Sequence, residues 1–139
     1  MTTIPGQELA PSLRAVRDEL FDLLEPYLGT YKLSRTSTAP AFYVVGPNQV
    51  RPQWSVTGIE AVLVNRPELE FMGGVGSLPT KRVWTLQVRN YDTDSSLEAV
   101  QVTLYRHFPN AIQRYMPQTE TTYEQLTVEL PDHILITLP

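Results

Sequence analysis

The stretch KRVWTLQVRNY, Lys81–Tyr91, alternates between apolar and polar side chains. A period of two is typical of a β-strand, because successive side chains point to opposite faces of a sheet. The pattern therefore predicts a strand with one face in the core and one semi-polar face. The core positions are Trp84, Leu86 and Val88, and the opposite positions are Val83, Thr85, Gln87 and Arg89.

The residues after this strand predict a helix. Ser95 and Glu98 have the spacing of a capping box, in which the serine hydroxyl satisfies a free amide and the glutamate reaches back. Pro109 ends or kinks the helix near Phe108, and AIQRYM, residues 111–116, is a candidate last turn. The apolar stripe consists of Leu97, Val100 and Leu104, widened by Ala99, Val102 and Tyr105.

The N-terminal half predicts one more helix and three strands. Apolar residues recur at helical spacing from Pro11 to Leu24, and Pro26 prevents continuation. TYKLSRT (30–36) and AFYVVG (41–46), separated by TAP (38–40), are rich in aromatic and β-branched residues, so they predict two strands and a candidate hairpin. A third strand covers Ile59–Val64, where Ile59, Ala61 and Leu63 alternate with Glu60, Val62 and Val64.

Two segments near the C-terminus complete the predicted sheet. TTYEQLTVEL (121–130) alternates with apolar residues on one side, and HILITLP (133–139) predicts a short closing strand. We therefore expect an α+β fold, with two α-helices packed on one face of a mixed or antiparallel sheet of about five to six strands. Residues 1–139 form a single domain, in which residues 1–10 are an extended N-terminal arm.

The other face of the predicted sheet carries polar alternates. They are too polar for a second core layer but suit a wet surface or a subunit contact. These positions are Thr85, Gln87, Arg89, Tyr123, Gln125 and Thr127.

Composition excludes several classes of protein. The chain has 139 residues, a net charge of -4 and no cysteine, so it has no disulfide, thiol nucleophile or thiolate zinc site. An acidic chain with pI near 5.1 is not expected to bind nucleic acid as its main ligand. The N-terminus does not resemble a signal peptide, and no apolar run is long enough to span a membrane.

Local motifs do not predict catalysis. FMGGVGSLPTKR (71–82) has glycines followed by Lys81, but a strand rather than a helix follows, so it is not a phosphate-binding P-loop. His107 and His133 lack metal-binding partners in the sequence, and no serine lies in a G-x-S-x-G motif. We therefore expect an interaction protein, not an enzyme.

A resemblance narrows the kind of interaction. The segments PAFYVVG (40–46), VTGIEAVLVNRPELEFMGG (56–74), VWTLQVRNYD (83–92) and SSLEAVQVTLYRHFPNA (95–111), after an N-terminal helix, resemble small tail terminator proteins of tailed bacteriophages, also called tail completion or neck proteins. The similarity runs from about Leu13 to Met116. Its most recognisable part is Val83–Pro109, a strand, an Asp turn and a helix that ends in Phe-Pro.

The resemblance implies a structural virion protein that needs no cofactor and no metal. Such subunits form a homo-oligomeric ring, usually a hexamer, which caps the tail tube, stops its polymerisation and joins the tail to the neck and head. The implied partners are the tail tube protein, a neck or connector protein and, in a contractile tail, a sheath protein. DNA crosses the channel without specific binding, and an acidic wall would repel it. Assembly would take place in the host cytoplasm, without a membrane.

We expect two regions to contact neighbouring subunits, although the loop at 71–82 fits equally well as a mobile connection on its own subunit. The loop candidates are Phe71, Met72, Gly73, Gly74, Gly76, Leu78, Lys81 and Arg82, and the strand candidates are Gln87, Arg89, Tyr123 and Gln125. Two alternatives stay open: a head-completion or connector protein, and a small ligand-binding or enzymatic α+β domain with a concave polar pocket.

Overall fold

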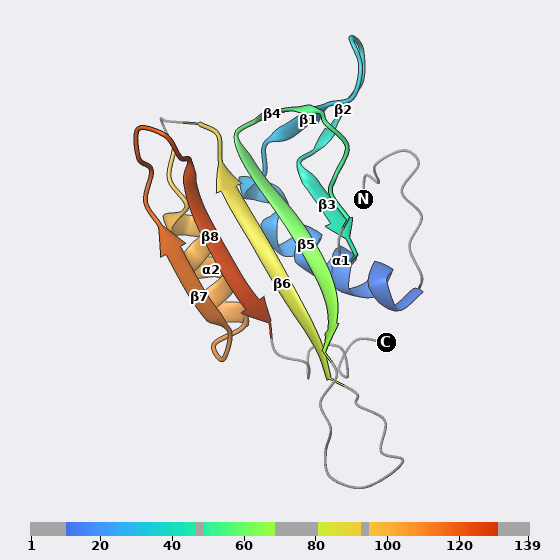
Figure 1. The fold of residues 1–139 in the computed structure, drawn as a ribbon, viewed down its shortest axis with the longest axis vertical. Helices are drawn as coiled ribbons and strands as arrows, with labels where there is room; N and C mark the ends of the chain where they lie inside the picture. The colour runs from blue at the N-terminus through green and yellow to red at the C-terminus, as the bar shows by residue number, and fades with distance from the viewer. Residues whose placement is uncertain (1–10, 47–48, 69–80, 93–94, 131–139) are drawn as a thin grey trace, which may run out of the picture.

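Strand β6 (Lys81–Asn90) lies at the centre of the main sheet in the computed structural model (Figure 1). The structure describes residues 11–46, 49–68, 81–92 and 95–130. The predicted terminal arm (1–10), most of the glycine loop and the predicted closing strand (133–139) lie outside these residues. The other elements are α1 (Pro11–Leu24), a 3-10 turn η1 (Glu25–Tyr27), β1 (Thr30–Lys32), β2 (Thr38–Pro40), β3 (Phe42–Val45), β4 (Ser55–Thr57), β5 (Ile59–Glu68), α2 (Glu98–His107), β7 (Ile112–Met116) and β8 (Glu124–Leu130).

The main sheet is mixed, as the sequence predicted. Its strand order is β3-β5-β6-β8-β7, in which β3 runs parallel to β5 and all other pairs are antiparallel. The register aligns Ala61, Val88 and Leu126 across the three central strands, and all three are buried. The alternation of β6 is confirmed, because Trp84 and Leu86 are buried while Gln87 and Arg89 are exposed.

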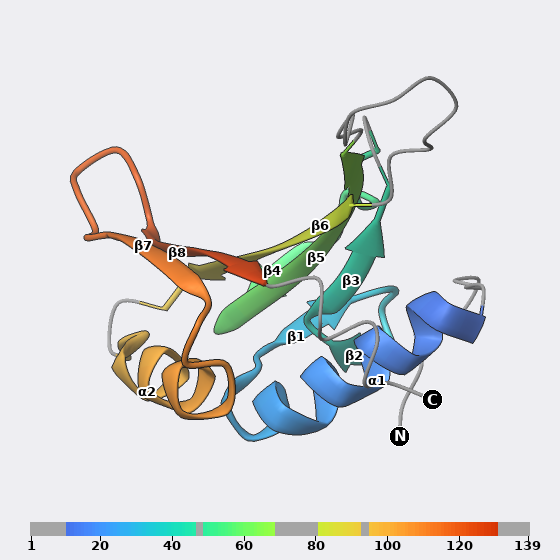
Figure 2. The ribbon, with the colours of Figure 1, turned by 90° about the horizontal axis from the view of Figure 1, so that it is seen from below.

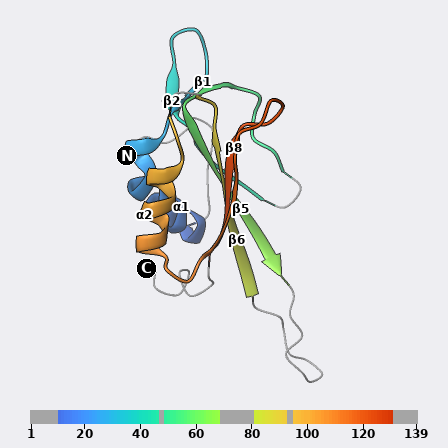
Figure 3. The same cartoon turned by 90° about the vertical axis from the view of Figure 1, so that its left-hand side faces the viewer.

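Both helices cover one face of this sheet (Figures 2 and 3). Helix α1 has the predicted bounds and buries Leu20, Phe21 and Leu24, and the rings of Phe21 and Phe42 meet edge to face at 5.9 Å. Helix α2 buries Val100 and Leu104. The opposite sheet face has no helix on it among the described elements.

A second, three-stranded sheet was not predicted. Its order is β2-β1-β4, so TAP is a strand and not a separator, and β1 pairs with β2 instead of with β3. The segment Phe42–Val45 is almost entirely buried, which suits a place beside β5 in the main sheet. In β1 only Tyr31 is buried, which suits a small sheet with one wet face.

Helix α2 begins differently from the prediction. It has no side-chain cap: Ser95 donates its hydroxyl to Asn90 Oδ1, and Glu98 does not reach back. Instead, Glu124 of β8 accepts the Leu97 amide at 3.1 Å and the Asn90 side-chain amide at 3.0 Å. The tertiary contact replaces the local capping box, because the buried Asn90 competes for the serine hydroxyl.

Two further predictions around α2 are wrong. AIQRYM is mostly strand β7, which pairs with β8 through Ile112–Met116 and is therefore not a last helical turn. Ala99, Val102 and Tyr105 do not widen the buried stripe, because they are exposed. The core under α2 is already filled from the sheet side by residues such as Leu126 and Val128.

The two sheets meet where two glycines approach closely. Gly58, between β4 and β5, has a φ of 79°, and a Cβ there would lie 2.9 Å from the Gly29 Cα. A Cβ on Gly29 would lie 1.8 Å from the Thr57 carbonyl oxygen. The Gly29 amide donates to the Ile59 carbonyl at 2.8 Å, so the close approach fixes β1 against the start of β5.

We predict that Gly58→Ala lowers the free energy of unfolding by about 2 kcal/mol, because alanine disfavours a positive φ and its methyl group meets the backbone. Gly46→Ala is the control, since its Cβ meets only the end of the Gln49 side chain, at 3.0 Å. Urea denaturation monitored by tryptophan fluorescence measures both. Equal losses in the two variants would contradict the steric explanation.

Candidate functional site on the uncovered sheet face

The side chains that face away from the helices form a regular grid. Strand register places Glu60, Arg89 and Gln125 side by side across β5, β6 and β8. One step along the strands, a second row consists of Val62, Gln87, Thr127 and Arg114. The grid is mainly polar, so this face is suited to recognition and not to a second core layer.

A groove of about 590 Å³ crosses this face. Its floor contains polar side chains of the grid and two valines of β5. The polar residues are Gln87, Gln125 and Thr127, and the valines are Val62 and Val64. Its wall includes residues 49–51, in the connection between β3 and β4. The groove therefore combines an apolar strip with amide, hydroxyl and guanidinium groups.

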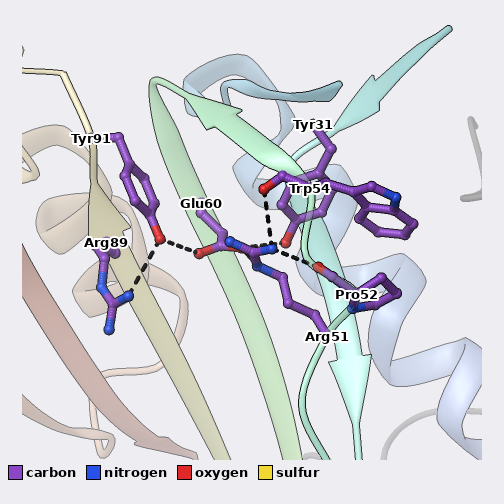
Figure 4. Close-up of polar contacts among 7 residues, drawn as sticks. All are labelled: Tyr31, Arg51, Pro52, Trp54, Glu60, Arg89 and Tyr91. Carbon is purple, nitrogen blue, oxygen red and sulfur yellow. Dashed lines mark hydrogen bonds and ion pairs between the residues drawn. The ribbon is translucent and has the colours of Figure 1, made fainter. Parts of the chain in front are cut away.

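The carboxylate of Glu60 is the most buried charge of the groove, with a residue exposure of only 4%. It accepts a hydrogen bond from the Tyr31 hydroxyl at 2.6 Å and one from the Tyr91 hydroxyl at 3.1 Å, and it forms an ion pair with Arg51 Nε (Figure 4). These partners come from β1, from the residue after β6 and from the β3–β4 connection. Burial of the charge is offset by a full set of partners.

Arg51 fastens the β3–β4 connection to the sheet. Its Nη1 donates to the Pro52 carbonyl at 2.7 Å and to the Trp54 carbonyl at 3.4 Å, while its guanidinium lies 5.1 Å from the centre of the Tyr31 ring. Trp54 in turn packs on Tyr31 and Tyr43, at 5.2 Å and 5.7 Å between ring centres. The wall of the groove is thus held by charge and by aromatic packing together.

Two pKa values reflect this environment. Burial, and then the hydrogen bond to Glu60, raise the pKa of the Tyr31 hydroxyl well above its ordinary value. Burial is the largest single effect and lowers the pKa of Arg51, but the Glu60 carboxylate together with Tyr91 and Tyr31 outweighs it, so the pKa of the guanidinium is raised. Tyr31 therefore stays a neutral donor and Arg51 a cation at physiological pH.

Arg89 remains accessible at the other side of Glu60. Its Nη1 donates to the Tyr91 hydroxyl at 3.3 Å, and its guanidinium lies 5.9 Å from the centre of the Tyr91 ring. The Tyr91 ring also packs against the Tyr123 ring in a tilted arrangement, with 4.7 Å between ring centres. Because Arg89 itself is exposed, its remaining N–H groups face solvent and are available to an anionic partner.

The predicted contact residues fall into three groups. Gln87, Arg89 and Gln125 do lie together on the uncovered face, and Tyr123 stacks beside them. Lys81 and Arg82 open β6, where their backbone pairs with the far end of β5. The candidates Phe71, Met72, Gly73, Gly74, Gly76 and Leu78 lie outside the described residues.

Sequence reasoning missed Tyr31, Arg51 and Glu60. The only signal was one acid, Glu60, at an alternate position in an otherwise apolar strand, and alternation alone indicates a solvated side chain there. Its burial depends on Arg51 and Tyr31, which come from segments that the sequence does not place beside β5. His107 is a surface residue, as predicted, and pairs with Glu19 of α1 at 3.2 Å.

Within residues 11–46, 49–68, 81–92 and 95–130, three or more His, Asp or Glu side chains nowhere converge as a metal site. No helix in the same ranges has the length and apolar character needed to cross a membrane. Comparison of the chain with protein-family models, with curated proteins and with solved structures finds no match. Function is therefore inferred from the surfaces themselves.

We predict that Glu60→Gln or Arg51→Met alone lowers the free energy of unfolding by about 3 kcal/mol, because each leaves a buried charge without its partner. The double variant should lose clearly less than the sum. Chemical denaturation of all three variants measures this coupling. Asp18→Asn is the control: its ion pair with Arg17 is more exposed, so the loss should stay below about 1 kcal/mol. Additive losses at Glu60 and Arg51 would contradict the coupling.

The raised pKa of Tyr31 predicts alkaline destabilisation. The folded chain keeps this hydroxyl protonated above pH of about 10, where tyrosine in the unfolded chain ionises, so its stabilising contribution is complete below that pH and declines above it. Tyr31→Phe should be less stable near neutral pH and should lose less stability between about pH 8 and pH 11. Urea midpoints at the two pH values measure the slope. Parallel slopes in the two proteins would contradict this role.

Proposed function

We propose that the chain is a structural virion protein, a tail terminator of a tailed bacteriophage that assembles into a ring, with a hexamer as the expected form. The observation that carries the proposal is an exposed apolar edge on the main sheet. Strand β7 is an edge strand, and Ile112 and Met116 on it are 56% and 58% exposed. Tyr105 of the neighbouring α2 is 65% exposed.

An edge strand with exposed apolar side chains is suited to association. Its free N–H and C=O groups can pair with another chain, and natural proteins normally protect such edges with charges, prolines or bulges. Here Arg114 is the only charged residue of β7, and the strand contains no proline. Clustered apolar exposure of this kind is typical of a protein contact.

The proposed role follows from shape and contact. A ring on the last ring of tail tube protein blocks further addition of tube subunits and offers its other side to a neck or connector protein. In a contractile tail, the sheath protein is a further partner. DNA passes through the channel without specific binding. The supporting features are an α+β fold with a mainly polar uncovered sheet face and an exposed edge strand.

The groove favours one alternative function, a small ligand-binding domain. Arg89, Gln87 and Gln125 converge on a concave surface beside the Arg51–Glu60 pair, and this combination of polar groups and an apolar strip is common in ligand sites. Such a domain would be a monomer or dimer that binds its ligand without a tail. Assembly state therefore separates the two functions.

We predict that phage particles made without this protein carry overlong tail tubes, because nothing stops tube polymerisation. Electron microscopy of the tails measures their length, and complementation with the wild-type chain is the control. Complementation with Ile112→Ser/Met116→Ser should fail, whereas Arg35→Ser, at an exposed site away from both the groove and the β7 edge, should restore normal tails.

Two results would overturn the proposal. Tails of normal length that fail to join heads would assign a connector role instead. Normal, infectious particles without the protein, together with a monomer that binds a small molecule, would assign the ligand-binding function.

A further inference from the structure

The exposed face of α1 carries an acidic stripe. Leu20 and Leu24 turn toward the core, and at 100° per residue Asp18, Asp22 and Glu25, the first residue of η1, fall on the opposite side, together with the exposed Arg14. The Asp18 side chain is 42% exposed, and Asp22 and Glu25 are exposed. Arg17 pairs with Asp18, whereas no hydrogen bond or ion pair engages the side chain of Asp22 or Glu25 within the described part of the chain.

The uncovered sheet face carries two exposed cations, Arg89 and Arg114. Among the described residues, the Arg89 side chain donates a hydrogen bond to the Tyr91 side chain alone, and Arg114 has no hydrogen-bond or ion-pair partner. The side chains described on this face include two acids. Glu60 is neutralised by Arg51, and Glu129 is half-buried one row away. This face therefore has a cationic surplus, although the chain as a whole is acidic.

The distance between the outer acids of the stripe is similar to the distance between the two arginines of the sheet face. Asp18 and Glu25 are about 11 Å apart along the helix axis, from the rise per residue. Arg89 and Arg114 lie on β6 and β7, two strand spacings and one register step apart, which corresponds to about 12 Å. A helix laid across the sheet face therefore places one acid near each arginine, with Gln125 and Thr127 between them.

We propose that the acidic stripe of α1 and η1 (Asp18, Asp22 and Glu25) docks on the Arg89–Arg114 face of a second copy of this chain. Helix α1 lies on the side of the main sheet opposite its uncovered face (Figure 3), so the contact is head-to-tail and each copy offers both halves of it. A head-to-tail contact closes into a ring when its rotation allows. The inference rests on the proposed ring and names one of its subunit contacts.

The test is a charge exchange measured by analytical ultracentrifugation of the full chain. A sheet variant, Arg89→Gln/Arg114→Glu, and a helix variant, Asp22→Lys/Glu25→Lys, should each weaken self-association by about tenfold or more, because each places like charges together. Mixing the two variants, or combining all four substitutions in one chain, should restore association. Raising NaCl from about 0.05 M to about 0.5 M should weaken the wild-type contact.

Arg35→Glu, on the exposed connection between β1 and β2, is the matched control and should leave association unchanged. Thermal melting identifies any variant that fails to fold, and Arg114→Glu alone replaces the sheet variant if needed, again with weakened association. If both charge-reversal variants still form oligomers as the wild-type chain does, this contact is overturned, while the terminator function is left intact. A wild-type chain that stays monomeric alone and on isolated tail tubes would overturn both.

Discussion

The alternation of β6 constrains both faces of the main sheet. Trp84, Leu86 and Val88 must face an apolar layer, and among the described elements the apolar stripes of α1 and α2 belong to the same core cluster. Once both helices lie on that side, the opposite side has no described helix left to cover it. Its polar side chains are then exposed because the apolar residues of the same strand are buried.

The buried carboxylate of Glu60 links the small sheet and the β3–β4 connection to the main sheet. It is bonded to Tyr31 of the small sheet, to Tyr91 beyond β6 and to Arg51 of the β3–β4 connection. Each partner brings its own backbone segment to one point. The same set of bonds holds the groove wall, so the attachment of the small sheet and the shape of the uncovered sheet face both involve one charge.

The exposed surfaces suit the proposed ring subunit. The edge strand β7 carries Ile112 and Met116, the segment from α1 into η1 carries exposed acids, and the uncovered sheet face carries Arg89 and Arg114. Apolar and charged contacts have different uses: burial of the edge supplies affinity, whereas matched charges select orientation and register. A ring subunit needs both, because its copies must associate in one geometry only.

Helix α1 and the alternation of β5, β6 and β8 were predictable, because their periods are long and regular. The local sequence also predicted which side chains of β6 and β8 share the polar face. It did not predict that AIQRYM is strand β7, that Phe42–Val45 pairs with β5, or that Glu124 caps α2. These outcomes depend on partners outside each segment, such as Leu126, which pairs with Tyr115 across β7 and β8, and Glu124, which accepts the Leu97 amide.

The sequence by itself determined the periodicity of each element, and through it the α+β class and the division of each strand into a core face and a polar face. Only the tertiary structure decided which polar residues are buried and which stay free. Glu60 and Arg89 are neighbours on the same face, yet one is buried by three partners and the other is accessible. The burial of a charge depends on groups that the fold brings near it in space. Strand alternation predicts the face on which a side chain lies, but it does not predict these neighbours.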